Sequence, residues 1–188
     1  TTTTISAEAA KLEKPQTAAW AAPGLSQMWV LFDRTGDLAR LKSQAVAYDP
    51  LSQREQAAVW ISETLHGNAE EVTKIIAALA RNDDGAALHA LLGIDYNLNM
   101  IAAVHQGMLF ETENSFFEQL RLAAPPDWGR TQRVMMGFER ATIAQRARAG
   151  LDLYRFTCRW LDDLIQPQHR EIIAYAVSLI PAEWERED

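Results

Sequence analysis

The 188 residues carry 18 Lys and Arg against 25 Asp and Glu, a formal net charge of −7, and 48% of them are hydrophobic. This acidic balance argues against a nucleic-acid backbone as the main partner, because phosphate binding needs clustered positive charge. Cys158 is the only cysteine, so no disulfide can form within one chain, and a cytoplasmic location is expected.

The start of the chain predicts a small α/β appendage over residues 1–48. Residues 1–6 are rich in β-branched side chains and indicate a strand, which a short helix over residues 8–12 follows. Residues 14–24 contain two prolines and a glycine, a composition typical of an irregular connection.

The apolar run MWVLF, residues 28–32, has the length of a second strand. It is followed by Asp-Arg-Thr-Gly at residues 33–36, the pattern of a type I turn. A helix over residues 37–47 completes the predicted appendage.

From residue 49 onward the patterns are helical, which predicts a mostly α protein with a bundle of about six helices over residues 49–181. Ser52 and Glu55 have the spacing of a capping box and begin a helix that should stop at Gly67. Asn68 begins the next one. Further helices are expected over residues 115–124, 131–138, 141–165 and 167–180, and residues 182–188 form a charged tail.

Residues 85–110 form the longest apolar run and are expected to be the central helix of the bundle. A helix that is apolar nearly all round lies inside a domain or in a membrane. Polar residues interrupt this run at several positions, so a membrane span is not predicted. No signal peptide or other transmembrane segment is expected either.

One polar stripe runs along this helix, because Asp95, Asn99 and Gln106 share one angular position. Unpaired buried polar groups are costly, so the stripe should meet water, a ligand or partner side chains. Two structural alternatives to a ligand site are a wet helix edge and an interhelical hydrogen-bond ladder. The predicted substrate-binding residues are the polar and charged ones on and beyond this helix, namely Asp95, Asn99, His105, Gln106, Glu111 and Glu113.

Neither a metal site nor a catalytic residue is predicted. The four histidines are far apart in the sequence and lack the spacing of a helical metal site. Cys158 lies on an apolar helical face and is interpreted as a core residue. The glycine-rich phosphate-binding patterns and the Gly-x-Ser-x-Gly pattern of hydrolases are absent.

Two segments, VLFDRTGDLARLKSQA at residues 30–45 and AGLDLYRFTCRWLDDLIQPQHREIIAYAVSLI at residues 149–180, together resemble one family. They look like nucleotidyltransferases of the polymerase-β superfamily, in the aminoglycoside and lincosamide adenylyltransferase-like group. In that group a catalytic α/β domain ends in a strand and an Asp-x-Thr-Gly turn, and a helical bundle follows. The resemblance implies transfer of a nucleotide from a nucleoside triphosphate to a small-molecule hydroxyl, with Mg²⁺ and ATP held by the catalytic part.

The chain departs from this family because it lacks the Gly-Ser motif and the paired Asp residues that hold Mg²⁺. On this alignment the catalytic face lies before residue 1, and the chain is the substrate-side helical domain. The alternative is a non-catalytic helical protein-interaction module. The expected partner is therefore a small-molecule substrate or another protein, and neither a nucleic acid nor a membrane.

Overall fold

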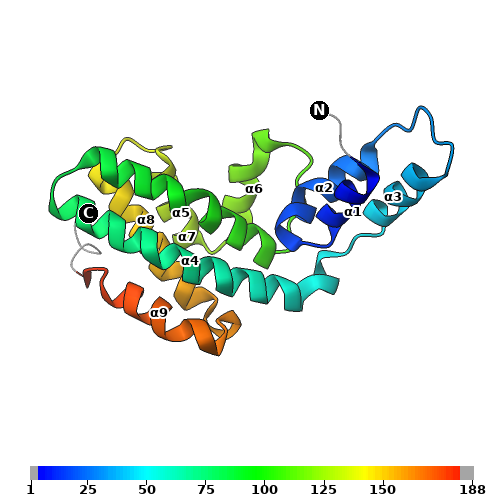
Figure 1. Ribbon diagram of the computed structural model, residues 1–188. Coiled ribbons are helices and arrows are strands. Elements are labelled where there is room, and N and C mark those ends of the chain that lie inside the picture. Colours follow the sequence, from blue (N-terminus) through cyan, green and yellow to red (C-terminus); the bar gives the residue numbers. More distant parts are fainter. Residues whose placement is uncertain (1–3, 183–188) are drawn as a thin grey trace.

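The computed structural model describes residues 4–182, and this part of the chain is built from α-helices joined by loops and three short 3₁₀ helices (Figure 1). The α-helices are α1 (Ile5–Leu12), α2 (Pro15–Gln27), α3 (Asp37–Val46), α4 (Arg54–Ala80), α5 (Asp84–His105), α6 (Phe116–Ala123), α7 (Pro126–Met136), α8 (Ile143–Trp160) and α9 (Pro167–Ser178). The 3₁₀ helices are η1 (Pro50–Gln53), η2 (Glu113–Ser115) and η3 (Asp162–Leu164). The prediction of a mostly α protein with a helical bundle is confirmed.

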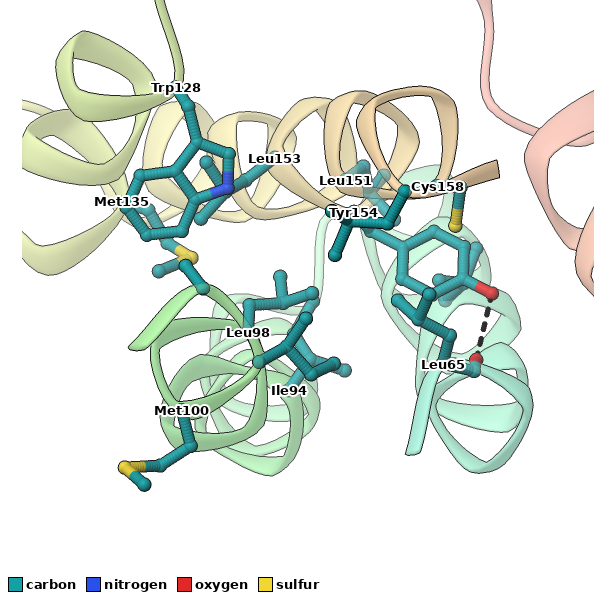
Figure 2. Packing of buried hydrophobic residues seen from close by; sticks show 14 of the residues in the cluster. Leu65, Ile94, Leu98, Met100, Trp128, Met135, Leu151, Leu153, Tyr154 and Cys158 are labelled. Atoms are coloured by element: carbon teal, nitrogen blue, oxygen red, sulfur yellow. Dashed lines mark hydrogen bonds between the residues drawn. The ribbon is translucent and has the colours of Figure 1, made fainter. Parts of the chain in front are cut away.

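Helix α5 is the centre of the bundle, as its apolar sequence predicted. It runs beside the long helix α4 and is crossed by α8 (Figure 1). Figure 2 shows Ile94 and Leu98 of α5 in the interior, close to Leu151 and Tyr154 of α8. The hydroxyl of Tyr154 donates a hydrogen bond to the carbonyl oxygen of Leu65 in α4 at 3.0 Å, so three helices meet at one point.

Within the described residues, α5 is also the one helix whose length and hydropathy would suffice to cross a membrane. Most of that stretch is buried against other helices of the same chain. Its apolar surface is therefore explained by its central place in the bundle.

Helix α4 is a single helix, and the predicted stop at Gly67 is wrong. Gly67 keeps ordinary helical backbone angles, and Leu65 and Ala69 on either side of it are buried against the core. Tertiary packing thus continues the helix where glycine alone would favour an end. The capping box at Ser52 does not form either, because the side chain of Asp49 begins η1 by accepting the N–H of Leu51 at 3.0 Å.

The predicted α/β appendage is wrong, since no strand forms between residues 4 and 182. Instead α1, α2 and α3 pack as a small helical unit around the buried side chains Leu12, Ala22, Leu41 and Ala45. Residues 1–3 of the first predicted strand lie outside the described part of the chain. Thr4 caps α1 by accepting the N–H of Ala7 at 3.2 Å, which begins a helix where β-branched composition had indicated a strand.

The region predicted as an irregular connection is helix α2. Its first proline, Pro15, occupies the first helical position, where a missing N–H costs nothing. Its second, Pro23, lies within the helix and cannot donate to the carbonyl oxygen of Ala19 four residues earlier. The backbone N–H of Phe110 donates to that carbonyl at 2.8 Å, which ties α2 to the chain that follows α5.

Helices α8 and α9 begin within two residues of the predicted positions, but α8 ends at Trp160, before the predicted Ile165, and η3 follows it. Helix α8 begins with a capping box in which Thr142 and Gln145 bond each other's backbone N–H groups. Helix α9 begins at Pro167 as predicted. Pro126 was expected to lie between two helices, but it is the first residue of α7, which therefore starts five residues before the predicted Thr131. The charged tail at residues 183–188 lies outside the described residues.

Candidate functional site

The predicted polar stripe begins in a buried hydrogen-bond ladder between α5 and α7. Asn99 is fully buried, and its Nδ2 donates to Oδ1 of Asp95 at 2.9 Å and to the Asp95 carbonyl oxygen at 2.8 Å. Gln132 of α7, also buried, donates from Nε2 to Oδ1 of Asn99 at 2.8 Å. This arrangement is the interhelical ladder that the sequence left open as a structural alternative.

Asp95 stands at the solvent side of this ladder. Burial raises the pKa of its carboxyl group, while the hydrogen bond from Asn99 and the charge of Arg146 lower it. Arg146 itself donates from Nε to the carbonyl oxygen of Met135 at 2.9 Å, so α8 and α7 hold its guanidinium in place. The polar groups around Asp95 therefore belong to α5, α7 and α8. Their arrangement does not by itself form a binding cleft.

The other four predicted residues lie at the far end of α5 and beyond it. His105 and Gln106 end the helix and are exposed, and Glu111 and Glu113 lie in and after the next loop, also exposed. From Asp95 to Gln106 the helix rises about 16 Å at 1.5 Å per residue. The structure thus separates the six residues into a buried ladder and an exposed end, and a shared role in ligand binding stays a prediction.

Of the four residues at the exposed end of α5 and beyond it, His105 makes a defined aromatic contact. Its ring meets Trp160 of α8 edge to face, with ring centroids 4.9 Å apart. Although the residue as a whole is exposed, the partial burial of its ring lowers the pKa of this imidazole, while the charge of Asp163 raises it and that of Arg54 lowers it. The contact with Trp160 accounts for the position of His105 without a ligand.

Three open grooves on the surface are lined by other residues. The first, about 580 Å³, lies beside α4 and is lined by Trp60 and by four charged residues, Glu13, Lys14, Glu55 and Glu63, of which three are acidic. An acidic rim is common on a chain with this net charge, so it does not by itself indicate a ligand. The second groove, about 350 Å³, lies between α4 and α9 at His66, and the third, about 430 Å³, lies between α2 and α5.

The most unusual surface is the segment of residues 28–32, between α2 and α3. In Figure 1 this connection loops out at one end of the molecule. Trp29 is 91% exposed, Leu31 is 93% exposed and Phe32 is 74% exposed. The apolar run predicted a strand here, yet this segment forms no strand, and no strand exists among the described residues with which it could pair.

The base of the 28–32 segment is well anchored, in contrast to its tip. Lys42 of α3 donates to the carbonyl oxygen of Met28 at 3.0 Å. On the other side Asp33 accepts the N–H of Ala39 at 3.0 Å, and Gly36 takes the left-handed backbone angle φ of 75° that a glycine tolerates. Between these anchors, the backbone groups of residues 29–32 form no hydrogen bond with any other described residue.

Metal and nucleophile chemistry find little support in residues 4–182. No group of three or more His, Cys, Asp or Glu side chains there could hold a metal ion. His66 and His169 stack ring on ring, and because imidazole lone pairs lie in the ring plane, stacked rings do not converge on one ion. Burial raises the pKa of Cys158 to about 12, so this thiol is protonated and unreactive at neutral pH.

Comparisons of the chain with protein families, with curated proteins and with solved structures find no match. The sequence did contain a sign of the 28–32 segment's importance: five consecutive apolar residues without the alternation of a half-buried strand.

Proposed function

We propose that this chain is a helical module that binds another folded polypeptide through the 28–32 segment. The observation that carries the proposal is the exposure of three large apolar side chains, Trp29, Leu31 and Phe32, at one protruding site. Contiguous apolar groups of this kind mark interaction sites on soluble domains. Aromatic side chains are also enriched at protein interfaces, where they supply large contact areas.

The backbone of the segment favours a β-sheet as the partner surface. Its free N–H and C=O groups could pair with the edge strand of a sheet, which is a common mode of peptide recognition. A run that is apolar at every position suits a strand covered on both faces, as in α/β domains. The chain bends at Leu31, so pairing would straighten it there.

A second candidate function specifies that partner. In the nucleotidyltransferases that the sequence resembles, an Asp-x-Thr-Gly turn follows the last catalytic strand directly, and here a bend over residues 34–36 leads into α3, with Asp33 accepting the N–H of Ala39. The partner would then be a cytoplasmic α/β domain with the Gly-Ser and paired Asp motifs, holding Mg²⁺ and ATP. The combined protein would transfer a nucleotide to a small-molecule hydroxyl, and the helical bundle would bind that acceptor.

The first proposal is tested with the polypeptide encoded directly upstream of this chain, or beside it. The two are expressed together and their complex is measured by size-exclusion chromatography with light scattering. The variant Trp29→Ser/Leu31→Ser/Phe32→Ser should lose the complex. Leu122→Ser, a matched change at a 70% exposed leucine of α6, should keep it. Failure of the wild-type chain to bind, or binding that survives the triple substitution, would contradict the proposal.

The second candidate has a separate requirement. The encoded partner must contain a Gly-Ser motif followed by paired Asp residues, and the complex must transfer a labelled nucleotide from ATP in the presence of Mg²⁺. A partner that binds through residues 28–32 but lacks both motifs would eliminate the nucleotidyltransferase function and leave the interaction module in place.

A further inference from the structure

The exposure of side chains alternates along the first four residues of the 28–32 segment. Met28 is half-buried against the apolar cluster of the α1–α3 unit, and Val30 is 37% exposed. Trp29 and Leu31, which follow them in turn, are 91% and 93% exposed. Side chains two residues apart share one face of an extended chain. The segment therefore has an inner face, turned to the helices of this chain, and an outer face that the described residues leave uncovered.

The backbone of the segment is already close to that of a strand where it begins. Met28 has a φ of −60° and a ψ of 143°, within the extended region. No residue from 29 to 32 has a positive φ. The chain bends at Leu31, and Phe32 beyond this bend is exposed. Straightening the bend brings Phe32 to the inner face, because it lies two residues after Val30.

Two hydrogen bonds fix which face of the segment is turned outward. The Nζ of Lys42 donates to the carbonyl oxygen of Met28 at 3.0 Å. At the other end, the side chain of Asp33 accepts the N–H of Ala39 at 3.0 Å. Lys42 and Ala39 both belong to α3, so both ends of the segment are tied to the same helix. Turning the inner face outward would break these bonds and expose Met28.

We infer that the 28–32 segment enters its partner in one orientation, with Trp29 and Leu31 buried by the partner and Val30 kept against the α1–α3 unit. The inference rests on the proposed function and describes the partner more closely. A strand inside an α/β domain is covered on both faces. Since the α1–α3 unit covers the inner face, the partner is an α/β domain whose sheet lacks a helix over one face at its edge. Its other face offers an apolar site for an indole and a leucine side chain.

The two faces are first compared in the free chain by thiol labelling. Cys158 is buried and its pKa is raised to about 12, so it gives a low background. Trp29→Cys, Val30→Cys and Leu31→Cys each add one thiol, and each labelling rate is divided by that of the same variant unfolded in urea. The thiols at positions 29 and 31 should react at nearly the unfolded rate, and the thiol at position 30 at least about threefold more slowly. Equal rates at the three positions would overturn the inference.

The contribution of each face to binding is then measured by titration calorimetry with the polypeptide encoded directly upstream of this chain, or beside it. Trp29→Ser and Leu31→Ser should each weaken the complex about thirtyfold or more, as the loss of a buried interface anchor does. Val30→Ser is the matched control. It should weaken the complex less than about fivefold, because its side chain faces the helices of its own chain.

The outcomes separate this inference from the proposed function. If the wild-type chain does not bind, the proposed function fails and the inference fails with it. If the wild-type chain binds and the triple substitution abolishes binding, the proposed function stands. In that case an effect of Val30→Ser as large as that of Leu31→Ser would overturn the orientation alone, and so would a small effect of both Trp29→Ser and Leu31→Ser.

Discussion

Gln132 donates a hydrogen bond from Nε2 to Oδ1 of Asn99 at 2.8 Å, and both side chains are buried. Through Asn99 the ladder continues to Asp95, so a polar chain crosses the contact between α5 and α7. These paired groups favour the observed register of the two helices, because another register would break both hydrogen bonds of Asn99, although Oε1 of Gln132 is itself buried without a hydrogen-bond partner.

Replacement of Asn99 by Leu should destabilise the protein by about 2 kcal/mol. The substitution removes the acceptor of Gln132 and the donor of Asp95 and leaves both groups partly or fully buried without partners. Urea denaturation followed by circular dichroism measures the loss as a lower midpoint at unchanged slope.

Gln106→Leu is the control for this prediction. Gln106 belongs to the same stripe in the sequence but is exposed, so its replacement should change stability by less than about 0.5 kcal/mol. A neutral effect of Asn99→Leu would show that the ladder does not stabilise the fold.

Gly150 of α8 is required by the close packing of α8 on α5. A Cβ added there would overlap Cδ1 of Leu91 and come within 3.6 Å of Sδ of Met135. Gly150→Ala should therefore cost about 1–3 kcal/mol through overpacking, although alanine is the better helix former. Thermal unfolding measures the change.

Gly67→Ala should have the opposite effect. Gly67 lies within α4, has ordinary helical angles, and has no atom within 4 Å of an added Cβ. The substitution should stabilise the protein by about 0.5–1 kcal/mol, because glycine is the poorer helix former. A destabilised Gly67→Ala protein would contradict the description of α4 as one continuous helix.

Asp95 should make stability depend on pH in the acidic range. Burial raises the pKa of its carboxyl group, so the folded protein holds this proton more tightly than the unfolded chain does. The contribution of protonated Asp95 to the stability of the fold is largest below the ordinary carboxyl pKa, and it is lost as the pH rises through the raised pKa of the folded protein. Asp95→Asn, which cannot ionise, should gain stability relative to wild type between about pH 3 and about pH 7. A difference that shrinks with rising pH would show that Arg146 outweighs burial.

Where a helix start was predicted correctly, the residues that determine it lie within one turn of that start. Pro167 marks the start of α9 within one turn, so it could be identified in the sequence alone, whereas the Thr142–Gln145 capping box, equally local, was not among the predicted helix starts. The errors have distant causes. Pro23 is accommodated in α2 where Phe110, far along the chain, bonds the carbonyl that it leaves free, and Gly67 continues α4 because both sides of it pack on the core.

The site was harder to predict than the fold. Periodicity located the stripe on α5 but could not show that Gln132, on another helix, would bury Asn99 in a ladder. The 28–32 segment was recognised as apolar and strand-like, and only its surroundings could show that the described residues leave it uncovered. The spacing of apolar and polar side chains in the sequence shows which face of an element has to be covered. Which residues cover that face is decided by the tertiary structure.

The most direct measurement of the central claim is amide hydrogen exchange at Trp29, Val30, Leu31 and Phe32, in the free chain and in its complex with the polypeptide encoded beside it. In the free chain these amides should exchange at nearly their intrinsic rates, because none of them has a hydrogen-bond partner among the described residues. In the complex they should be protected about a hundredfold or more by pairing with a sheet edge. Exchange at the free-chain rate in a stable complex would contradict the claim that this segment binds the partner as a strand.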